Sequence, residues 1–148
     1  MNAEKVIKKD WYYRSDHEWI NFQGTVGYVG VCGFKLKGIR QIRQALVSAN
    51  DVSKRQGETI ATIRYDDYEV PINMPVDGKI IRINEAHRTG EQDIVLKQAE
   101  SNVWIALITS NNHYERKNLL QPQQYKSILQ RNVWIFYANR NNSFVAPG

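Results

Sequence analysis

Two short β-prone runs joined by only two residues constrain the fold more than any other feature of the sequence. Thr59–Tyr65 and Tyr68–Ile72 are rich in branched and aromatic side chains, and Asp66-Asp67 lies between them. Such runs favour strands, and a two-residue connection is typical of a tight hairpin. Aspartate tolerates the left-handed backbone that this kind of turn uses. We therefore predict a β-hairpin with two aspartates at its exposed tip.

Turn signals also separate other short runs along the chain. Gln23-Gly24 lies between two of them and favours a second hairpin, and residues 75–78 form a Pro-Val-Asp-Gly turn. The polar stretch over 50–56 indicates a loop. From these patterns we expect strands over residues 18–22, 25–31, 45–47, 79–83, 103–109 and 132–138, and helical segments within 33–43, 93–99 and 119–130. The chain is thus predicted to be mainly β.

Length and composition exclude several classes of protein. A chain of 148 residues fits one domain that buries a core without disulfides. With 42% hydrophobic and 24% charged residues, it is neither disordered nor collagen-like. Its apolar runs are far shorter than the about 20 residues of a membrane helix, and the single Cys32 cannot form an intramolecular disulfide. The first ten residues resemble no targeting peptide, so we expect a cytoplasmic protein.

No catalytic or metal-binding motif is visible. The three histidines are scattered, without a cysteine, histidine or acidic residue at metal-ligand spacing: His17, His87 and His113. Cys32 follows an apolar run, which favours a small buried side chain over a nucleophile. Asp66, Asp67 and Glu69 on an exposed turn would be solvated, so turn chemistry explains them better than a pair of catalytic carboxylates. We expect no catalytic residue and no metal, and hence no enzyme.

A basic cluster stands out from the mild overall charge of +5. Four cations occur within nine residues, with no acidic residue between them: Lys35, Lys37, Arg40 and Arg43. The cluster is interpreted either as a solvated turn or as a surface for a protein or a phosphate-bearing partner. Together with eight tyrosines and four tryptophans it also permits a nucleic-acid-binding module. Because most of those aromatics fall in predicted core strands, packing explains them better.

The C-terminal region contains the longest apolar run of the chain, Val133–Tyr137. A strand with one face in water alternates, and this run does not, so we expect a strand over 132–138 with both faces covered. It either closes the edge of the fold or pairs with another chain, including a second copy of this one. We favour the interface, with Trp134 and Phe136 in the partner surface.

Several short motifs, in order and at nearly ungapped spacing, resemble the H protein of the glycine cleavage system, a relative of lipoyl domains. The residues that carry the resemblance are Tyr13-Arg14-Ser15-Asp16-His17-Glu18-Trp19, Val29-Gly30-Val31, Gly57-Glu58, Pro75-Val76-Asp77-Gly78, Asn84-Glu85-Ala86, Trp104-Ile105, Leu119-Leu120 and Tyr125. The resemblance covers about residues 12–130 and implies the flattened β-barrel, or barrel-sandwich hybrid, of lipoyl and biotinyl domains. Residues 1–11 and 131–148 are then an N-terminal and a C-terminal extension.

The carrier hairpin departs from that family at its chemical residue. In the family, the tip presents a lysine to which lipoate is attached. Counting from Gly57 and from Pro75 places that lysine position at Asp67, directly after Asp66. In the same count, Arg64 stands at the position of a family glutamate. No lysine lies between Arg55 and Gly78. A carboxylate cannot be lipoylated, so the resemblance implies a carrier scaffold without its cofactor.

We therefore expect a non-catalytic H-protein-like domain that binds protein partners and holds no cofactor. Two other functions stay open. One is a working carrier modified elsewhere, for which Lys79 is the nearest candidate, and the other is a nucleic-acid-binding module.

Overall fold

The computed structural model describes residues 10–36, 39, 42–84, 104–110 and 118–141, with the backbone alone for 132–141. These residues form nine strands, one short 3-10 helix and one α-helix. In chain order they are β1 (Trp11–Tyr13), β2 (Glu18–Gln23), β3 (Val26–Val31), η2 (Gly33–Leu36), β4 (Gln44–Val47), β5 (Val52–Lys54), β6 (Thr59–Tyr65), β7 (Tyr68–Asn73), β8 (Gly78–Ile83), β9 (Ala106–Ser110) and α2 (Pro122–Asn141).

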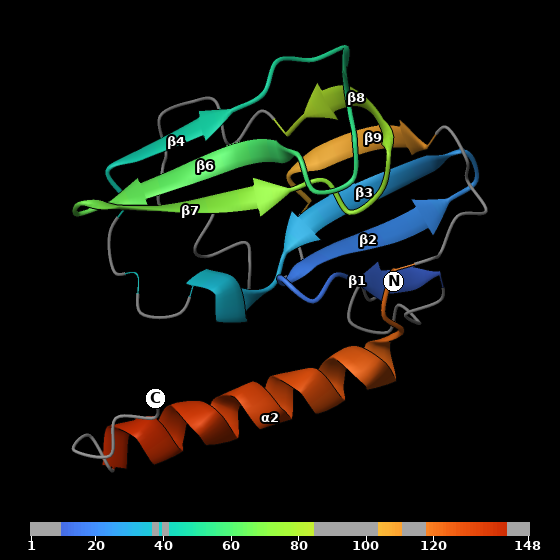
Figure 1. Cartoon of the computed structure of the whole chain (residues 1–148). Coiled ribbons are helices and arrows are strands. Elements are labelled where there is room, and N and C mark those ends of the chain that lie inside the picture. Colours follow the sequence, from blue (N-terminus) through green and yellow to red (C-terminus); the bar gives the residue numbers. More distant parts are fainter. Residues whose placement is uncertain (1–9, 37–38, 40–41, 85–103, 111–117, 142–148) are drawn as a thin grey trace, which may run out of the picture.

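The strands make two antiparallel sheets. The larger has the order β1-β2-β3-β9-β8-β5, and the smaller has the order β4-β6-β7. Figure 1 shows the smaller sheet beside the larger one, with α2 below β1 and outside both sheets. The fold is mainly β and corresponds to the flattened β-barrel expected from the sequence.

Branched side chains from both sheets fill the space between them. Ile20 and Val29 come from the larger sheet and Ile63 and Ile72 from the smaller, and all four are almost completely buried. Branched residues suit strands because their side chains pack well on a pleated surface. The two sheets are therefore held together by one continuous apolar core.

Both predicted hairpins are confirmed. In the hairpin of β6 and β7, Tyr65 pairs with Tyr68, so Asp66 and Asp67 alone form the turn. Asp66 adopts the left-handed backbone, with φ of 48°, as its residue type allows. The hairpin of β2 and β3 turns at Gly24, which also has a positive φ.

A glycine in β3 makes room for a tryptophan in β2. Gly30 pairs with Trp19, and a Cβ atom at Gly30 would lie only 2.2 Å from the Trp19 ring. Trp19 also stacks on Trp11 of β1, with ring centroids 4.5 Å apart. This is why glycine interrupts an otherwise apolar strand.

Two predictions about secondary structure are wrong. Residues 132–138 are not a strand but continue α2, which ends at Asn141. A run of consecutive apolar residues has no period, so it fits a helix as well as a strand. Within the predicted loop over 50–56, Val52–Lys54 forms β5 because it pairs with β8 at the edge of the larger sheet. The predicted helix over 93–99 lies outside the described residues.

The start of α2 is well defined by its sequence. Pro122 is the first helical residue, a position where its missing N–H is not needed. The side chain of Gln124 reaches back and accepts a hydrogen bond from the backbone N–H of Gln121 (2.8 Å). Leu120 pairs with Tyr13 of β1, which fixes the entry of the helix against the sheet. Within the described residues, no helix has the length and apolar character needed to cross a membrane.

Candidate functional site

The tip of the β6–β7 hairpin is held from the side by β4. The Arg43 guanidinium donates a hydrogen bond to the backbone oxygen of Asp66 (2.9 Å). The backbone N–H of Arg43 donates to the backbone oxygen of Arg64 (2.7 Å). Nε of Arg64 donates to Glu69 across the hairpin (2.6 Å), and Nη1 donates to Gln44 (3.2 Å). These contacts fix the turn between the two strands.

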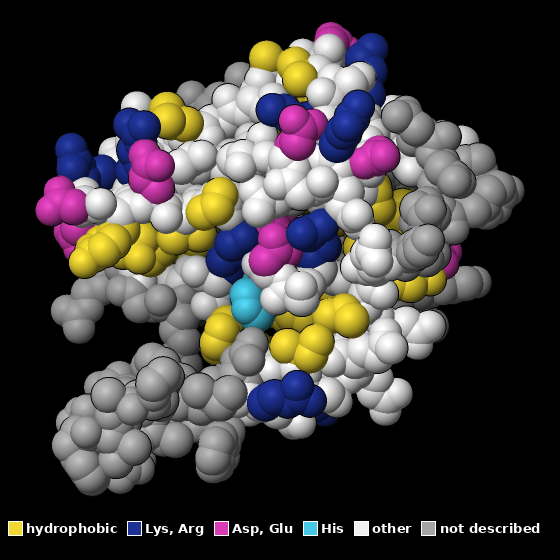
Figure 2. Space-filling view, viewed as in Figure 1, with side chains coloured by type: hydrophobic (Ala, Val, Ile, Leu, Met, Phe, Trp, Pro, Cys, Tyr) yellow, Lys and Arg dark blue, Asp and Glu magenta, His cyan; other side chains and the backbone are white. Residues whose placement is uncertain are grey.

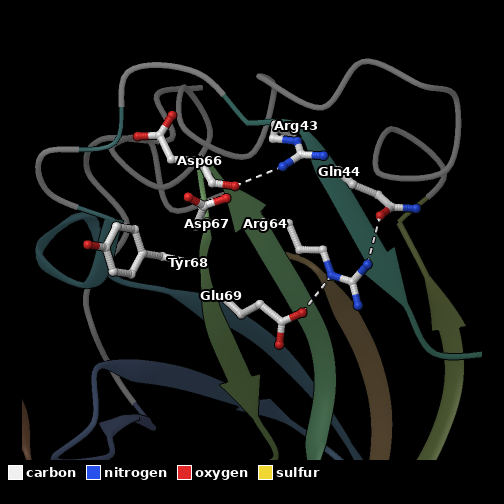
Figure 3. Close-up of a pocket in the computed structure, with 7 residues that line it drawn as sticks. All are labelled: Arg43, Gln44, Arg64, Asp66, Asp67, Tyr68 and Glu69. Carbon is white, nitrogen blue, oxygen red and sulfur yellow. Dashed lines mark hydrogen bonds and ion pairs between the residues drawn. The ribbon is translucent and has the colours of Figure 1, made fainter.

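An open hollow of about 470 Å³ lies at this tip. Figure 3 shows its seven lining residues, with the two arginines on one side and the turn on the other: Arg43, Gln44, Arg64, Asp66, Asp67, Tyr68 and Glu69. Figure 2 shows basic, acidic and hydrophobic side chains next to one another at this end of the molecule. The tip therefore offers hydrogen-bond donors and acceptors of both charges to a partner.

An aromatic residue completes the tip. The Tyr68 side chain is 65% exposed, and its ring lies 5.7 Å from that of Tyr65 on the neighbouring strand. A large exposed aromatic beside arginine is the composition typical of a protein contact.

The tip does not fit covalent attachment of lipoate. Attachment to a lysine forms an amide and needs a primary amine, and the residues of the turn are Asp66 and Asp67. The lysines nearest to the turn along the chain are Lys54, in β5, and Lys79, in β8, and both strands belong to the larger sheet. Lys79 pairs with Asp51 (3.9 Å) at the far edge of that sheet. The two residues of the turn therefore do not supply the amine that attachment of lipoate needs.

The predicted basic surface is not brought together as a unit by the described residues. Lys35 is only 11% exposed, because its ammonium lies against the buried carboxyl group of Glu18. Arg43 is exposed but belongs to the hairpin tip. Lys37 and Arg40 lie outside the described residues, and so do the side chains of Trp134 and Phe136.

A buried carboxyl group is the polar site that our sequence reasoning missed. The Glu18 side chain is completely buried at the start of β2. Its Oε2 accepts hydrogen bonds from Nζ of Lys35 (2.5 Å) and from the backbone N–H of Asn73 at the end of β7 (2.8 Å). The motif His17-Glu18-Trp19 carries part of the family resemblance, but it does not indicate that Glu18 is buried, because the partners Lys35 and Asn73 lie 17 and 55 residues away along the chain.

Two neighbours of Glu18 complete this cluster. Nε of Arg14 lies 2.9 Å from Oδ1 of Asp16 and 3.8 Å from Oε1 of Glu18. Burial raises the pKa of Glu18 to about 7, and a hydrogen bond with Asp16 acts in the same direction against the Lys35 charge. Burial alone would raise the pKa of Asp16 too, but hydrogen bonds with Glu18 and Arg14 hold it well below its usual range. The two carboxyl groups are thus separated in acidity.

A second polar contact joins this cluster to α2. Nδ1 of His17 and the hydroxyl of Tyr125 lie within hydrogen-bond distance (2.8 Å). The Tyr125 ring stacks on that of Tyr13, with centroids 4.4 Å apart. Burial and the Lys35 charge lower the pKa of His17, so its ring is neutral at neutral pH. Burial raises the pKa of Tyr125 above its ordinary value, so its hydroxyl keeps its proton.

The part of the chain that the structure describes contains no group of three His, Cys, Asp or Glu side chains suited to a metal ion. Cys32 is half-buried and packs against the cluster formed by Tyr13, Trp19 and Tyr125. His87 and His113 lie outside the described residues.

Comparisons with known proteins point in one direction. The family model described as "Glycine cleavage H-protein" matches residues 11–132. A glycine cleavage system H protein of Carboxydothermus hydrogenoformans is 25% identical over 125 residues, which are 84% of this chain and 95% of that protein. The H protein of Clostridium botulinum, strain Loch Maree, is 27% identical over 118 residues, or 80% of this chain and 89% of the relative.

The fold also matches a solved structure. A glycine cleavage system H protein from Mycobacterium marinum superimposes with a TM-score of 0.67 at 18% sequence identity. The match covers 82% of this chain and 97% of the other.

Proposed function

The chain belongs to the glycine cleavage H-protein family, whose members are carriers rather than catalysts, and on that premise we propose that it is a member without lipoate that works by binding a protein partner. The observation that supports this most directly is the tip of the β6–β7 hairpin. Asp67 stands where alignment on Gly57 and Pro75 puts the carrier lysine, and an aspartate side chain has no amine to acylate.

The surroundings of Asp67 support a binding role for the same tip. Arg43 and Arg64 hold the turn through hydrogen bonds on both sides, so little freedom is lost when a partner binds. Tyr68 is exposed beside them. We infer that the tip keeps the docking surface of a carrier and lacks the arm.

The two other functions have less support. A carrier modified at Lys79 would present its arm from the strand pair β5–β8 of the larger sheet and not from the tip of the β6–β7 hairpin. A nucleic-acid-binding surface would need the cluster of four cations, and Lys35 is already paired with Glu18.

Intact-mass measurement tests the first half of the proposal. The full-length protein is expressed with lipoate ligase and lipoate, beside a lipoylated H protein as the positive control. We expect the unmodified mass for this chain. A mass increase of one lipoyl group, mapped to any lysine, would overturn the proposal, and mapping to Lys79 would establish the alternative carrier.

Binding by tip variants tests the second half. Partners captured from the native cell by the full-length protein are purified, and their affinity is measured by calorimetry for wild type, Tyr68→Ala and Arg43→Ala. We expect a tenfold or greater loss for Tyr68→Ala, because exposed aromatics dominate such contacts. Lys54→Ala, on the larger sheet, is the matched surface control. Equal affinities for all of these variants would place the binding surface elsewhere.

A further inference from the structure

One oxygen of the Glu18 carboxyl group has no N–H donor within the described part of the chain. Oε2 accepts two hydrogen bonds. Among the described residues, no hydrogen bond from an N–H group reaches Oε1, whose nearest cation is Nε of Arg14 at 3.8 Å. An oxygen in this position, completely shielded from water, is unfavourable unless it is itself bonded to a proton.

The partner for such a proton is Asp16. Arg14 and Asn73 each contact both carboxyl groups and so hold Asp16 beside Glu18. A hydrogen bond between them lowers the pKa of Asp16 and raises that of Glu18, and two carboxylates cannot bond unless one of them is protonated. Asp16 is the better acceptor because Arg14 neutralises it (2.9 Å). Glu18 is the better donor because it is buried. The geometry therefore assigns one proton to the pair, bound to Glu18 and directed at Asp16.

We propose that this shared proton is a pH-sensitive latch that holds the β1–β2 turn against the end of β7. The turn consists of residues 14–17. Asp16 accepts a hydrogen bond from the Asn73 side chain (3.3 Å), and Glu18 accepts one from the Asn73 backbone. Both acidic groups thus contact one residue of the smaller sheet.

Loss of the proton has a definite physical effect. Glu18 keeps its contacts with Lys35 and Asn73, since a carboxylate is the stronger acceptor. Asp16, however, loses the hydrogen bond from Glu18 and faces a second negative charge at contact distance. Asp16 is partly exposed and can move towards water, so the turn is the part that loosens.

Among the residues that the structure describes, the charged and titratable groups near Glu18 bear on this equilibrium. From the β1–β2 turn they are Arg14, Asp16 and His17, from the segment after β3 Cys32 and Lys35, and from α2 Tyr125. His17 is neutral and Tyr125 protonated near pH 7. The two cations favour loss of the proton, and burial together with Asp16 opposes it. Figure 2 shows the histidine at the surface, with acidic and basic side chains directly beside it. Because the Asp16 side chain is 34% exposed, the shared proton can exchange with solvent through Asp16.

Nuclear magnetic resonance on the full-length protein tests the shared proton. The Glu18 carboxyl carbon and the Asn73 amide proton are followed between pH 4 and 9. We expect both to titrate with one midpoint near 7. Asp16→Asn should lower that midpoint by one pH unit or more, because the like charge is removed and the new amide can donate. Asp67→Asn, which removes an acidic group at the exposed tip, should leave the midpoint unchanged. A wild-type midpoint near that of an ordinary glutamate, or no effect of Asp16→Asn, would overturn the shared proton.

Hydrogen exchange tests the latch itself. The His17 amide donates to Arg14 within the turn (3.0 Å). After correction for the intrinsic exchange rate, we expect its protection to fall tenfold or more between pH 5.5 and 8.5, whereas the Ile63 amide in the core should not change. Glu18→Gln keeps a donor towards Asp16 at every pH and should make His17 protection independent of pH. Constant His17 protection in the wild type, or the same pH dependence in Glu18→Gln, would overturn the latch.

Discussion

At each of its two ends, the β6–β7 hairpin has a cation in contact with a carboxyl group, but the surroundings are opposite. At the tip, Arg64 and Glu69 pair at 2.6 Å with both side chains about half exposed. At the base, where Thr59 pairs with Asn73, the completely buried Glu18 contacts Lys35 and Asn73. Water screens the first pair and is excluded from the second. Similar distances in the two places therefore mean very different contributions to stability, and only the tip is free to change with function.

The largest effect is expected at the base. Glu18→Ala would leave the Lys35 ammonium in a nearly buried site without its partner and the Asn73 amide without its acceptor. Removal of one partner from a buried pair costs about 3–5 kcal/mol, so we expect a loss of this size in urea unfolding. Glu69→Ala at the tip is the matched control. If both variants lose the same free energy, burial does not distinguish the two ends.

The pH dependence of stability is the second effect. The pKa of Glu18 is raised from 4.5 to about 7 in the folded protein. Between these values the folded state binds more protons than the unfolded state, so Glu18 stabilises the fold fully below pH 4.5 and this contribution is lost as pH rises through 7. A shift of this size corresponds to roughly 3 kcal/mol.

Two neighbouring groups change the stability with pH in the opposite direction. The pKa of His17 is lowered from 6.5, so its contribution is lost as pH falls below that value. The pKa of Asp16 is lowered from 3.8, so its contribution is lost only in stronger acid. The Glu18 part is isolated by subtracting the unfolding free energy of Glu18→Gln from that of the wild type at each pH. A difference that stays flat from pH 5 to 9 would contradict the assignment.

A smaller effect is expected where α2 docks. Tyr125→Phe removes the hydroxyl that contacts His17 and keeps the ring that stacks on Tyr13. A single neutral hydrogen bond contributes about 1 kcal/mol, so we expect a loss near that value in thermal unfolding. Tyr125→Ala, which also removes the buried ring, should cost several times more. A Phe variant as unstable as the Ala variant would mean that the hydroxyl is the main anchor of α2.

The smallest effect belongs to the tip. Arg64→Ala removes an exposed ion pair with Glu69 and a contact with Gln44, and such pairs contribute about 0–1 kcal/mol. We expect a midpoint of denaturation within error of the wild type, in low and high salt alike. A loss above 2 kcal/mol would show that the tip contacts are structural and would make the two ends of the hairpin alike.

Local patterns in the sequence predict the structure at the tip of the β6–β7 hairpin, but they do not predict the contacts at its base. The turn at Asp66 and Asp67 follows from residue type and from the length of the connection, both local properties. The base depends on Lys35 and Asn73, which lie 17 and 55 residues from Glu18 along the chain. A local sequence pattern does not predict contacts between residues so far apart. The strand predicted over 132–138 was wrong because five consecutive apolar residues carry no period.

The contact of Gly30 with the Trp19 ring has a consequence for how this protein evolves. Any side chain at Gly30 would overlap the indole, and a small residue at position 19 would leave a void beneath the glycine. Each single replacement thus produces a less fit intermediate, whereas a paired replacement restores the volume. Positions 19 and 30 should therefore be replaced together across lineages. The aspartates of the tip make no such contact with these two positions and should change independently of them.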